Sequence, residues 1–302
     1  MNIIFFGASV TEQTHLSGFV PTFRETIENN KLNYNVIQKG FGSMHLSDAG
    51  ICKIDTIINE KPDICFLDWF STGFITIDKS ELFLYLDVIV RKLILINSKI
   101  CFLLLERLDL CNNRLTMFSI VKEYCNLYNI HFIEIYNNTN KNELLRDDVH
   151  TNELGAQLYS NKIYEYFVNN IINKDIEYTN IPNENKYSNI KTLQVNKDIY
   201  DEINMNGNFE IVGILQKMGN FCGIVEIIRN DEIGYKLNTW DPWCYFTRDS
   251  IKIQIPLSNT VKIKILQDEF NTDDCKNDIN FNEFKKYMYI YEIFYLGELS
   301  IY

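Results

Sequence analysis

The sequence has no concentration of basic residues and no long apolar run. Its 302 residues include 29 Lys and Arg against 40 Asp and Glu, a net charge of −11. A surface that binds the nucleic-acid backbone needs clustered Lys and Arg, so we expect no nucleic-acid partner. The most apolar stretch, "LILINSKICFLLL", is interrupted by Asn97, Ser98 and Lys99. It falls short of the roughly 18 apolar residues of a spanning helix, so we expect no membrane span.

The sequence also lacks closely spaced cysteines and the features of a signal peptide. The eight cysteines are scattered, with no C-x-x-C pair and no metal-ligand spacing to a histidine. This arrangement favours buried, reduced thiols over disulfides, and it lacks the pattern of a metal site. The first residues have no basic segment, and their apolar run is shorter than that of a signal peptide. We therefore expect a cytoplasmic protein that uses no metal or organic cofactor.

The sequence does have an alternation of strand-like and helix-like segments, from residue 1 to about 173. The five short apolar runs are "NIIFF", "YNVIQ", "DICFLDW", "KICFLLLE" and "IHFIEIY". The segments of helical period between and after them are about 17–30, 46–59, 79–97, 113–128 and 152–172. Repeated strand–helix units predict a parallel sheet with helices on both faces. Such sheets bind ligands at the carboxyl ends of their strands.

The composition and the periodicity of the sequence change after this region. "NKDIEYTNIPNENKYSN" is polar, rich in Asn and includes Pro182, which is typical of a linker. Beyond it, runs of period two such as "CGIVEIIR" and "VKIKIL" predict a smaller antiparallel β-sandwich. The predicted organisation is a first domain at 1–175, a linker at 176–190 and a second domain at 191–302.

Two motifs fall at the carboxyl edge of the predicted sheet. In "MNIIFFGASVTEQ" the first strand ends at Gly7 and leads to Ser9, a place suited to a nucleophile but also to a turn former. After the fifth strand, "RDDVHTNELG" sets Asp147 three residues before His150. One turn can place that carboxylate against one imidazole nitrogen and leave the other nitrogen facing the sheet edge. Each motif alone is equally suited to capping a helix, but together they predict a Ser-His-Asp triad.

The order and spacing of these blocks resemble those of the SGNH (GDSL-like) hydrolases over residues 1 to about 173. "FFGASVT" looks like the first block of that family, with Ala8 in place of the usual Asp, and "KGFGSMHLSDAG" looks like the second. The resemblance implies a flavodoxin-like, three-layer α/β/α fold with a five-stranded parallel sheet. It also implies that Ser9 is the nucleophile, His150 the base and Asp147 the residue that orients the base.

The same resemblance implies three donors to the oxyanion of the tetrahedral intermediate. One is the N–H of Ser9, and the second is a backbone N–H of the second block, at Gly42 or Ser43. The third block is "DWFSTG" in place of the family's G-x-N-D, so Thr72 stands where the family has an Asn that donates.

Further side chains near the predicted edge each have two interpretations. His45 contacts substrate or only begins the second helix. Asp68 and Trp69, at the end of the third strand, line the substrate pocket or are packed locally. In the second domain, Trp240 and Trp243 stack on a sugar or anchor the core of the small sandwich.

The resemblance and the appended β domain favour a serine-dependent hydrolase of acyl esters, acetyl esters in particular, on a carbohydrate or glycan. Its partner would be an acylated saccharide or a small acyl ester. Two alternatives stay open. One is an O-acyltransferase that modifies a surface polysaccharide or its precursor. The other is a non-catalytic glycan-binding protein on a hydrolase fold.

Overall fold

The structure is a computed structural model, and it describes the chain except for residues 72–77, 137, 196–198, 220–221, 240–246 and 268–285. The chain divides into two compact units, Met1–Ser188 and Asn189–Tyr302. The first unit is α/β and the second is antiparallel β structure, as the sequence predicts. In the described part of the chain, no helix combines the length and apolar character needed to cross a membrane.

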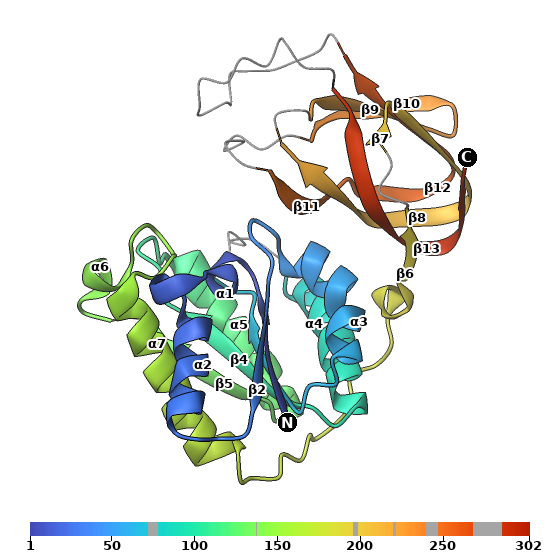
Figure 1. Cartoon of the computed structure of the whole chain (residues 1–302). Helices are drawn as coiled ribbons and strands as arrows, with labels where there is room; N and C mark the ends of the chain where they lie inside the picture. Colours follow the sequence, from blue (N-terminus) through green and yellow to red (C-terminus); the bar gives the residue numbers. More distant parts are fainter. Residues whose placement is uncertain (72–77, 137, 196–198, 220–221, 240–246, 268–285) are drawn as a thin grey trace. The chain divides into compact units, whose positions relative to one another are not determined.

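A five-stranded parallel sheet of order β2-β1-β3-β4-β5 forms the centre of the first unit (Figure 1). Its strands are β1 (Asn2–Gly7), β2 (Asn35–Gly40), β3 (Ile64–Asp68), β4 (Lys99–Leu105) and β5 (His131–Ile135). They coincide with the five apolar runs, because strands covered on both faces must be apolar on both. This strand order is flavodoxin-like, and the predicted fold class is confirmed.

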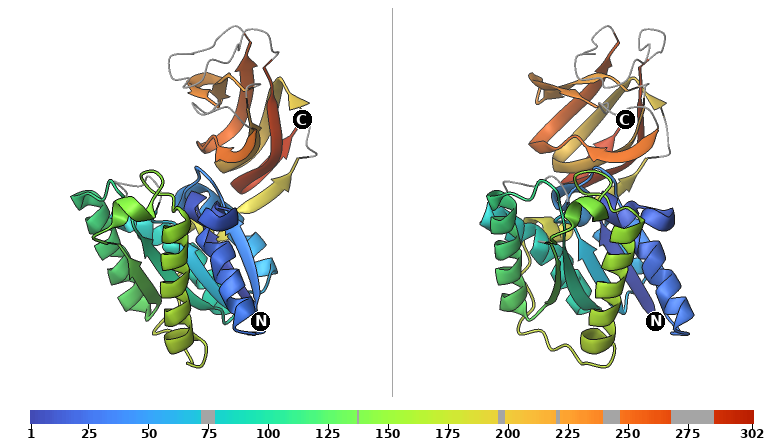
Figure 2. Two further views of the ribbon diagram at one scale, coloured as in Figure 1. Left: turned by 60° about the vertical axis from the view of Figure 1, so that its left-hand side comes forward. Right: turned by 90° about the vertical axis from the view of Figure 1, so that its left-hand side faces the viewer.

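Helices cover both faces of this sheet (Figures 1 and 2). On one face lie α2 (Phe19–Asn29) and α7 (Glu153–Tyr166), which pack against each other. The other face carries α3 (Ile51–Asn59), α4 (Lys79–Leu95) and α5 (Asn112–Tyr128). The shorter helical elements are α1 (Ser9–Glu12), α6 (Lys141–Leu144), the 3-10 turns His15–Ser17 and Lys186–Asn189, and the π-helical turns Leu46–Gly50 and Phe167–Ile171.

The segment predicted as a linker, 176–190, is bonded to the first unit over much of its length. The Tyr178 hydroxyl accepts the N–H of Ile100 at 2.9 Å and donates to the Ser98 carbonyl at 2.7 Å. Arg91 of α4 donates to the carbonyl of Pro182 at 2.9 Å. The boundary between the units therefore falls at Ser188. The polar composition identifies a segment without strands, but it does not reveal these bonds to residues distant in sequence.

The second unit consists of antiparallel strands joined in one hydrogen-bonded sheet. Its main path has the order β10-β9-β12-β8-β13-β6, with β11 paired to β8 and β7 paired to β13. The long strands β8 and β13 pair along most of their length, and one apolar core takes side chains from β8, β9, β12 and β13. The strands are β6 (Lys191–Gln194), β7 (Ile199–Tyr200), β8 (Glu202–Met218), β9 (Ile224–Arg229), β10 (Glu232–Asn238), β11 (Arg248–Lys252), β12 (Ile255–Leu266) and β13 (Met288–Ile301).

Candidate active site

Ser9 begins α1, a single helical turn at the carboxyl end of β1. A four-residue helix has no stability of its own, so contacts with other elements must hold it. Gly7 precedes it, and a Cβ on Gly7 would lie 2.3 Å from the carbonyl oxygen of Asp68. The glycine lets β1 approach the end of β3 so closely that the N–H of Ala8 donates to the same carbonyl at 2.9 Å. Ser9 thus lies where the strand order reverses, the usual ligand site of such sheets.

His150 and Asp147 come from a tight turn between α6 and α7. The turn is closed by a bridge between Leu145 and Thr151. Inside it, the Asp147 carboxylate accepts the N–H groups of Val149 at 3.0 Å and of His150 at 2.8 Å. The turn therefore orients the carboxylate through its own backbone, next to the imidazole.

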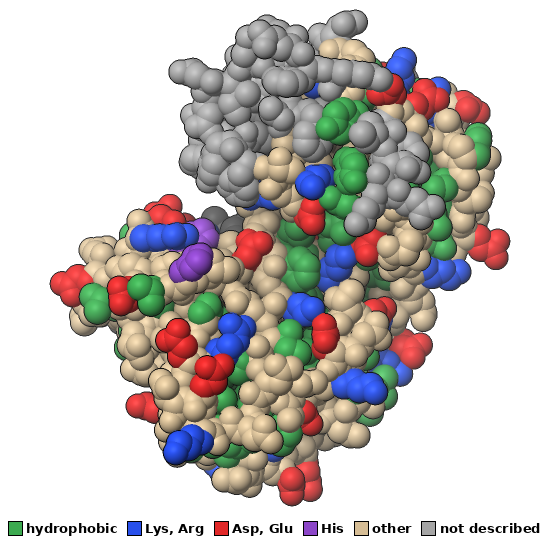
Figure 3. Space-filling model, viewed as in Figure 1, with side chains coloured by type: hydrophobic (Ala, Val, Ile, Leu, Met, Phe, Trp, Pro, Cys, Tyr) green, Lys and Arg blue, Asp and Glu red, His purple; other side chains and the backbone are tan. Residues whose placement is uncertain are grey.

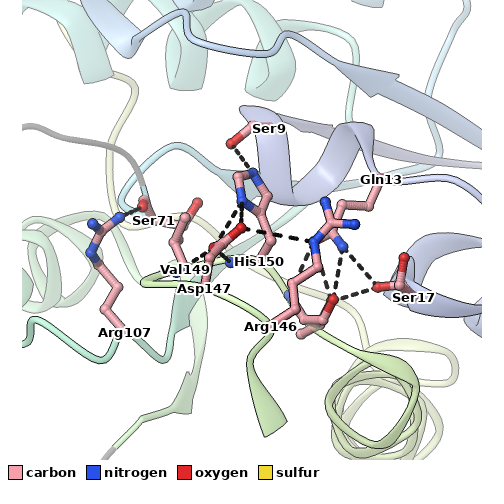
Figure 4. Close-up of polar contacts among 10 residues, drawn as sticks. Ser9, Gln13, Ser17, Ser71, Arg107, Arg146, Asp147, Val149 and His150 are labelled. Atoms are coloured by element: carbon pink, nitrogen blue, oxygen red, sulfur yellow. Dashed lines mark hydrogen bonds and ion pairs between the residues drawn. The ribbon is translucent and has the colours of Figure 1, made fainter. Parts of the chain in front are cut away.

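The side chains of Ser9, His150 and Asp147 form one hydrogen-bonded chain (Figure 4). The imidazole Nε2 is 2.9 Å from Ser9 Oγ, and Nδ1 is 2.9 Å from Asp147 Oδ2. Partial burial opposes ionisation of Asp147, but the N–H groups of His150 and Val149 and the imidazole together hold its pKa below the ordinary value. An ionised carboxylate at Nδ1 keeps a proton on that nitrogen and leaves Nε2 to accept one from the serine.

Asp68 and Trp69 lie beneath the surface of this edge. The Asp68 carboxylate is fully buried and accepts hydrogen bonds from the hydroxyls of Thr11 at 2.9 Å and Ser71 at 2.6 Å. Burial raises the pKa of Asp68 to about 6, although these hydrogen bonds oppose the change. The Trp69 ring is 1% exposed and lies against the ring of Phe6. Of the two interpretations, the geometry favours local packing, in which Asp68 joins the turn after β1 to the segment after β3.

The second block follows β2 and runs beside α1. A Cβ on Gly40 would lie 2.3 Å from the backbone nitrogen of Glu12, so this glycine permits the close approach. The N–H of Phe41 donates to the carbonyl of Gly7 at 2.9 Å, which fastens the loop to β1. Gly42 and Ser43 come next, and Ser43 has a left-handed φ of 57°.

His45 is partly buried where the loop leads into the π-helical turn before α3. Its N–H donates to Asp48 Oδ1 at 2.6 Å, the pattern of a helix start. This contact agrees with a role in beginning the helix. Thr72, Trp240 and Trp243 lie outside the described residues. The third oxyanion donor and the aromatic pair therefore stay predictions from the sequence.

Sequence reasoning missed two buried polar residues beside the site. Gln13 follows α1, and its amide bonds to Thr151, the residue after His150. Arg107 follows β4, and its guanidinium donates to the carbonyl of Ser71 and pairs with Asp109 at 2.6 Å. Both act through contacts with residues far away along the chain, and no local pattern in the sequence marks them.

On the face shown in Figure 3, Lys and Arg side chains are interspersed with Asp and Glu. Among the residues that the structure describes, no group of three or more His, Cys, Asp or Glu side chains is placed to hold a metal ion. The side chains around Ser9 are held by hydrogen bonds, buried carboxylate contacts and aromatic packing.

No protein-family model matches the chain, and no curated protein matches it. Solved structures do match. A two-domain esterase (CEX) active on acetylated mannans is 12% identical and aligns over 99% of this chain and 92% of its own, with a TM-score of 0.69. The acetyl xylan esterase AlAXEase is 22% identical over 55% of this chain and 98% of its own, with a TM-score of 0.48. Esterase EstA from Pseudoalteromonas sp. is 14% identical over 56% and 99%, with a TM-score of 0.49.

At these identities the likeness is one of fold. The first unit has the fold of the SGNH (GDSL-like) hydrolases, as the sequence motifs imply. The arrangement of a parallel α/β unit followed by an antiparallel β unit is shared with the two-domain esterase.

Proposed function

We propose that this chain is a serine esterase that removes acetyl groups from a carbohydrate. The observation that carries the proposal is the hydrogen-bonded chain from Ser9 through His150 to Asp147, with both bonds of the imidazole at 2.9 Å. The reaction type rests on this geometry. The choice of an acetylated saccharide is suggested by the shared two-unit fold of an esterase active on acetylated mannans.

In the first half of the proposed reaction, Ser9 Oγ attacks the carbonyl carbon of the ester while His150 Nε2 takes the hydroxyl proton. The tetrahedral intermediate then collapses, the bond to the sugar oxygen breaks, and the imidazolium gives its proton to that oxygen. The acetyl group remains on Ser9. Water attacks it in the second half by the same proton transfers, which releases acetate and restores the serine. Asp147 holds the imidazole tautomer throughout.

The oxyanion of each tetrahedral intermediate requires N–H or O–H donors. We assign the N–H of Ser9 and the N–H of Gly42 or Ser43, with the Thr72 hydroxyl as the third donor. The neighbouring N–H groups of Phe41 and Met44 donate to the carbonyls of Gly7 and Phe41, respectively, so we do not assign them as oxyanion donors.

A small fluorophosphonate probe tests the proposal directly. It should label Ser9 in the folded protein, because His150 makes that hydroxyl nucleophilic. The Ser9→Ala variant should not be labelled. The exposed Ser119 on α5, whose hydroxyl donates to the carbonyl of Leu115, provides the control, since Ser119→Ala should be labelled like the natural chain. Labelling of another serine, or of none in folded protein, would overturn the assignment.

Product analysis with acetylated mannan or xylan oligosaccharides then identifies the reaction. Release of free acetate, abolished in Ser9→Ala, supports the esterase. Transfer of the acetyl group to a second glycan would instead support the O-acyltransferase, which uses the same acyl-enzyme. Binding of the oligosaccharide with neither product would support a glycan-binding protein.

A further inference from the structure

Gln13 lies four residues after Ser9, and the residue is 8% exposed. The amide reaches the backbone of Thr151, the residue that follows His150. Its Nε2 donates to the carbonyls of Thr151 and Ser17, both at 3.0 Å, and its Oε1 accepts the N–H of Thr151 at 3.2 Å. The side-chain amide therefore pairs with the backbone N–H and C=O of Thr151, as a residue of a neighbouring β-strand would.

This pairing joins two short elements that carry the two reacting side chains. Ser9 and His150 are 141 residues apart in sequence, and each lies on a single turn of backbone. Gln38 of β2 fixes the far end of α1, because its Nε2 donates to the carbonyls of Thr11 at 2.6 Å and Gln13 at 2.8 Å. Gln13 is thus anchored to the sheet through its backbone and to the His150 turn through its side chain.

Other side chains fit this place poorly. A Glu at position 13 would have no donor when ionised and would set a carboxylate against two carbonyl oxygens. An Asn is one methylene too short to reach both partners. Both hydrogens of the glutamine amide are used, and the buried amide leaves no polar group unpaired.

We propose that Gln13 is a positioning residue that holds Ser9 Oγ within hydrogen-bond distance of His150 Nε2 through its pairing with the Thr151 peptide. The inference rests on the proposed function, since it concerns the same serine chemistry. A displacement of about 1 Å between reacting groups can cost on the order of 100-fold in rate, so a support this close to both groups controls the rate rather than substrate affinity.

The test compares the natural chain with Gln13→Ala and Gln13→Glu. The rate of Ser9 labelling by a small fluorophosphonate is measured together with kcat and KM for a small aryl acetate, on samples whose folded fraction is known from thermal unfolding. Labelling and kcat should fall by about 10- to 100-fold, with KM changed by less than about 3-fold. Gln157→Glu is the matched control: this exposed amide on α7 bonds to Asn161, and both rates should be unchanged.

The pH profile separates positioning from a merely structural role. In Gln13→Glu, protonation of the carboxylate restores one donor, so the labelling rate relative to the natural chain should rise as the pH falls. A structural role alone predicts a lower unfolding temperature with no change in the rates of the folded fraction. Should Gln13→Ala not fold, Gln13→Asn retains both donors on a shorter side chain and should show an intermediate loss of kcat.

The outcomes distinguish this inference from the proposed function. If Ser9 of the natural chain is labelled and folded Gln13 variants are labelled equally fast, the positioning role is wrong while the esterase proposal stands. If Ser9 of the natural chain is not labelled at all, the proposed function fails first, and the positioning role fails with it.

Discussion

The two segments that meet at the Ser9–His150 hydrogen bond are held in different ways. The turn that carries Ser9 depends on distant residues: Thr11 bonds to Asp68 of β3, and the end of the turn bonds to Gln38 of β2. The turn that carries His150 is held largely by its own residues, since the Asp147 carboxylate accepts two N–H groups from the next three residues, and Gln13 joins it to the turn that carries Ser9. Asp68 is fully buried, whereas the Asp147 side chain is 49% exposed.

This contrast distinguishes residues that affect the reaction rate from residues that affect the free energy of unfolding. A change in the His150 turn alters groups near the surface, and the buried core keeps its contacts. A change beneath Ser9 alters a buried carboxylate whose hydrogen bonds join α1 to the end of β3 and the segment after it. We therefore expect substitutions of the catalytic side chains in the His150 turn to reduce the rate with little effect on the free energy of unfolding. Substitutions beneath Ser9 should change that free energy.

The largest effect is expected for Asp147→Asn. The amide no longer holds the imidazole tautomer that leaves Nε2 free to accept a proton, so kcat for an aryl acetate should fall by about 10³-fold. The free energy of unfolding should change by less than about 1 kcal/mol, because the side chain is half exposed.

Asp148→Asn is the matched control for this variant, since Asp148 is the next carboxylate in the same exposed turn. Its kcat should equal that of the natural chain. A loss below about 10-fold in Asp147→Asn would show that the imidazole does not need this carboxylate.

The next largest effect is expected in the pH dependence of the free energy of unfolding, to which Asp68 should contribute. Its pKa in the folded chain is raised from 3.8 to about 6 by burial, so the folded state binds a proton more tightly than the unfolded state. The associated stabilisation is fully present below about pH 4 and is lost as the pH rises through about 6, a difference of up to about 3 kcal/mol.

Asp68→Asn should remove this dependence, because an amide does not titrate. Urea unfolding of both proteins between pH 4 and pH 7 measures it, with the exposed Asp175→Asn as the control that keeps the natural pH dependence. If the free energies of unfolding of Asp68→Asn and the natural chain change with pH in the same way, the buried carboxylate has an ordinary pKa.

The same contrast explains what the sequence can reveal. The five strands and five long helices were predictable, because burial on two faces or on one helical stripe leaves a pattern in the apolar residues. Asp147 and His150 were predictable as a pair because one turn contains both. The elements that the sequence does not predict, α1 and α6, are single helical turns next to the site, too short to be stable without contacts to other elements.

The supports of Ser9 were not predictable for the same reason. Gln13 and Gln38 are polar residues in a loop and on an outer strand, and only the folded chain shows what they bond. The second unit follows the same rule. The run "IKIQIPL" alternates with period two like the other runs of this domain, which predicts one strand. The backbone breaks instead at Ile253, which has a φ of 63°, and β11 and β12 lie on either side of it.

The smallest effect is expected at Gly42, in comparison with Gly40 two residues earlier. A Cβ on Gly42 would meet the carboxylate oxygen of Glu12 at 2.1 Å, an atom at the far end of a side chain, which moves at less cost than backbone does. A Cβ on Gly40 would meet the backbone nitrogen and Cα of Glu12 at 2.3 Å, atoms that α1 holds in place. Gly42→Ala should therefore cost less than about 1 kcal/mol of unfolding free energy, and Gly40→Ala more than about 2 kcal/mol.

A Glu12→Ala background sharpens this last comparison. With the Glu12 carboxylate removed, Gly42→Ala has no side chain to displace, and its cost in urea unfolding should fall close to zero. The cost of Gly40→Ala should persist, because its obstacle is the backbone of residue 12 and not the side chain. Equal costs for the two alanines in both backgrounds would mean that α1 moves as readily as a side chain. The turn that carries Ser9 would then be far less firmly held than its hydrogen bonds to β2 and β3 indicate.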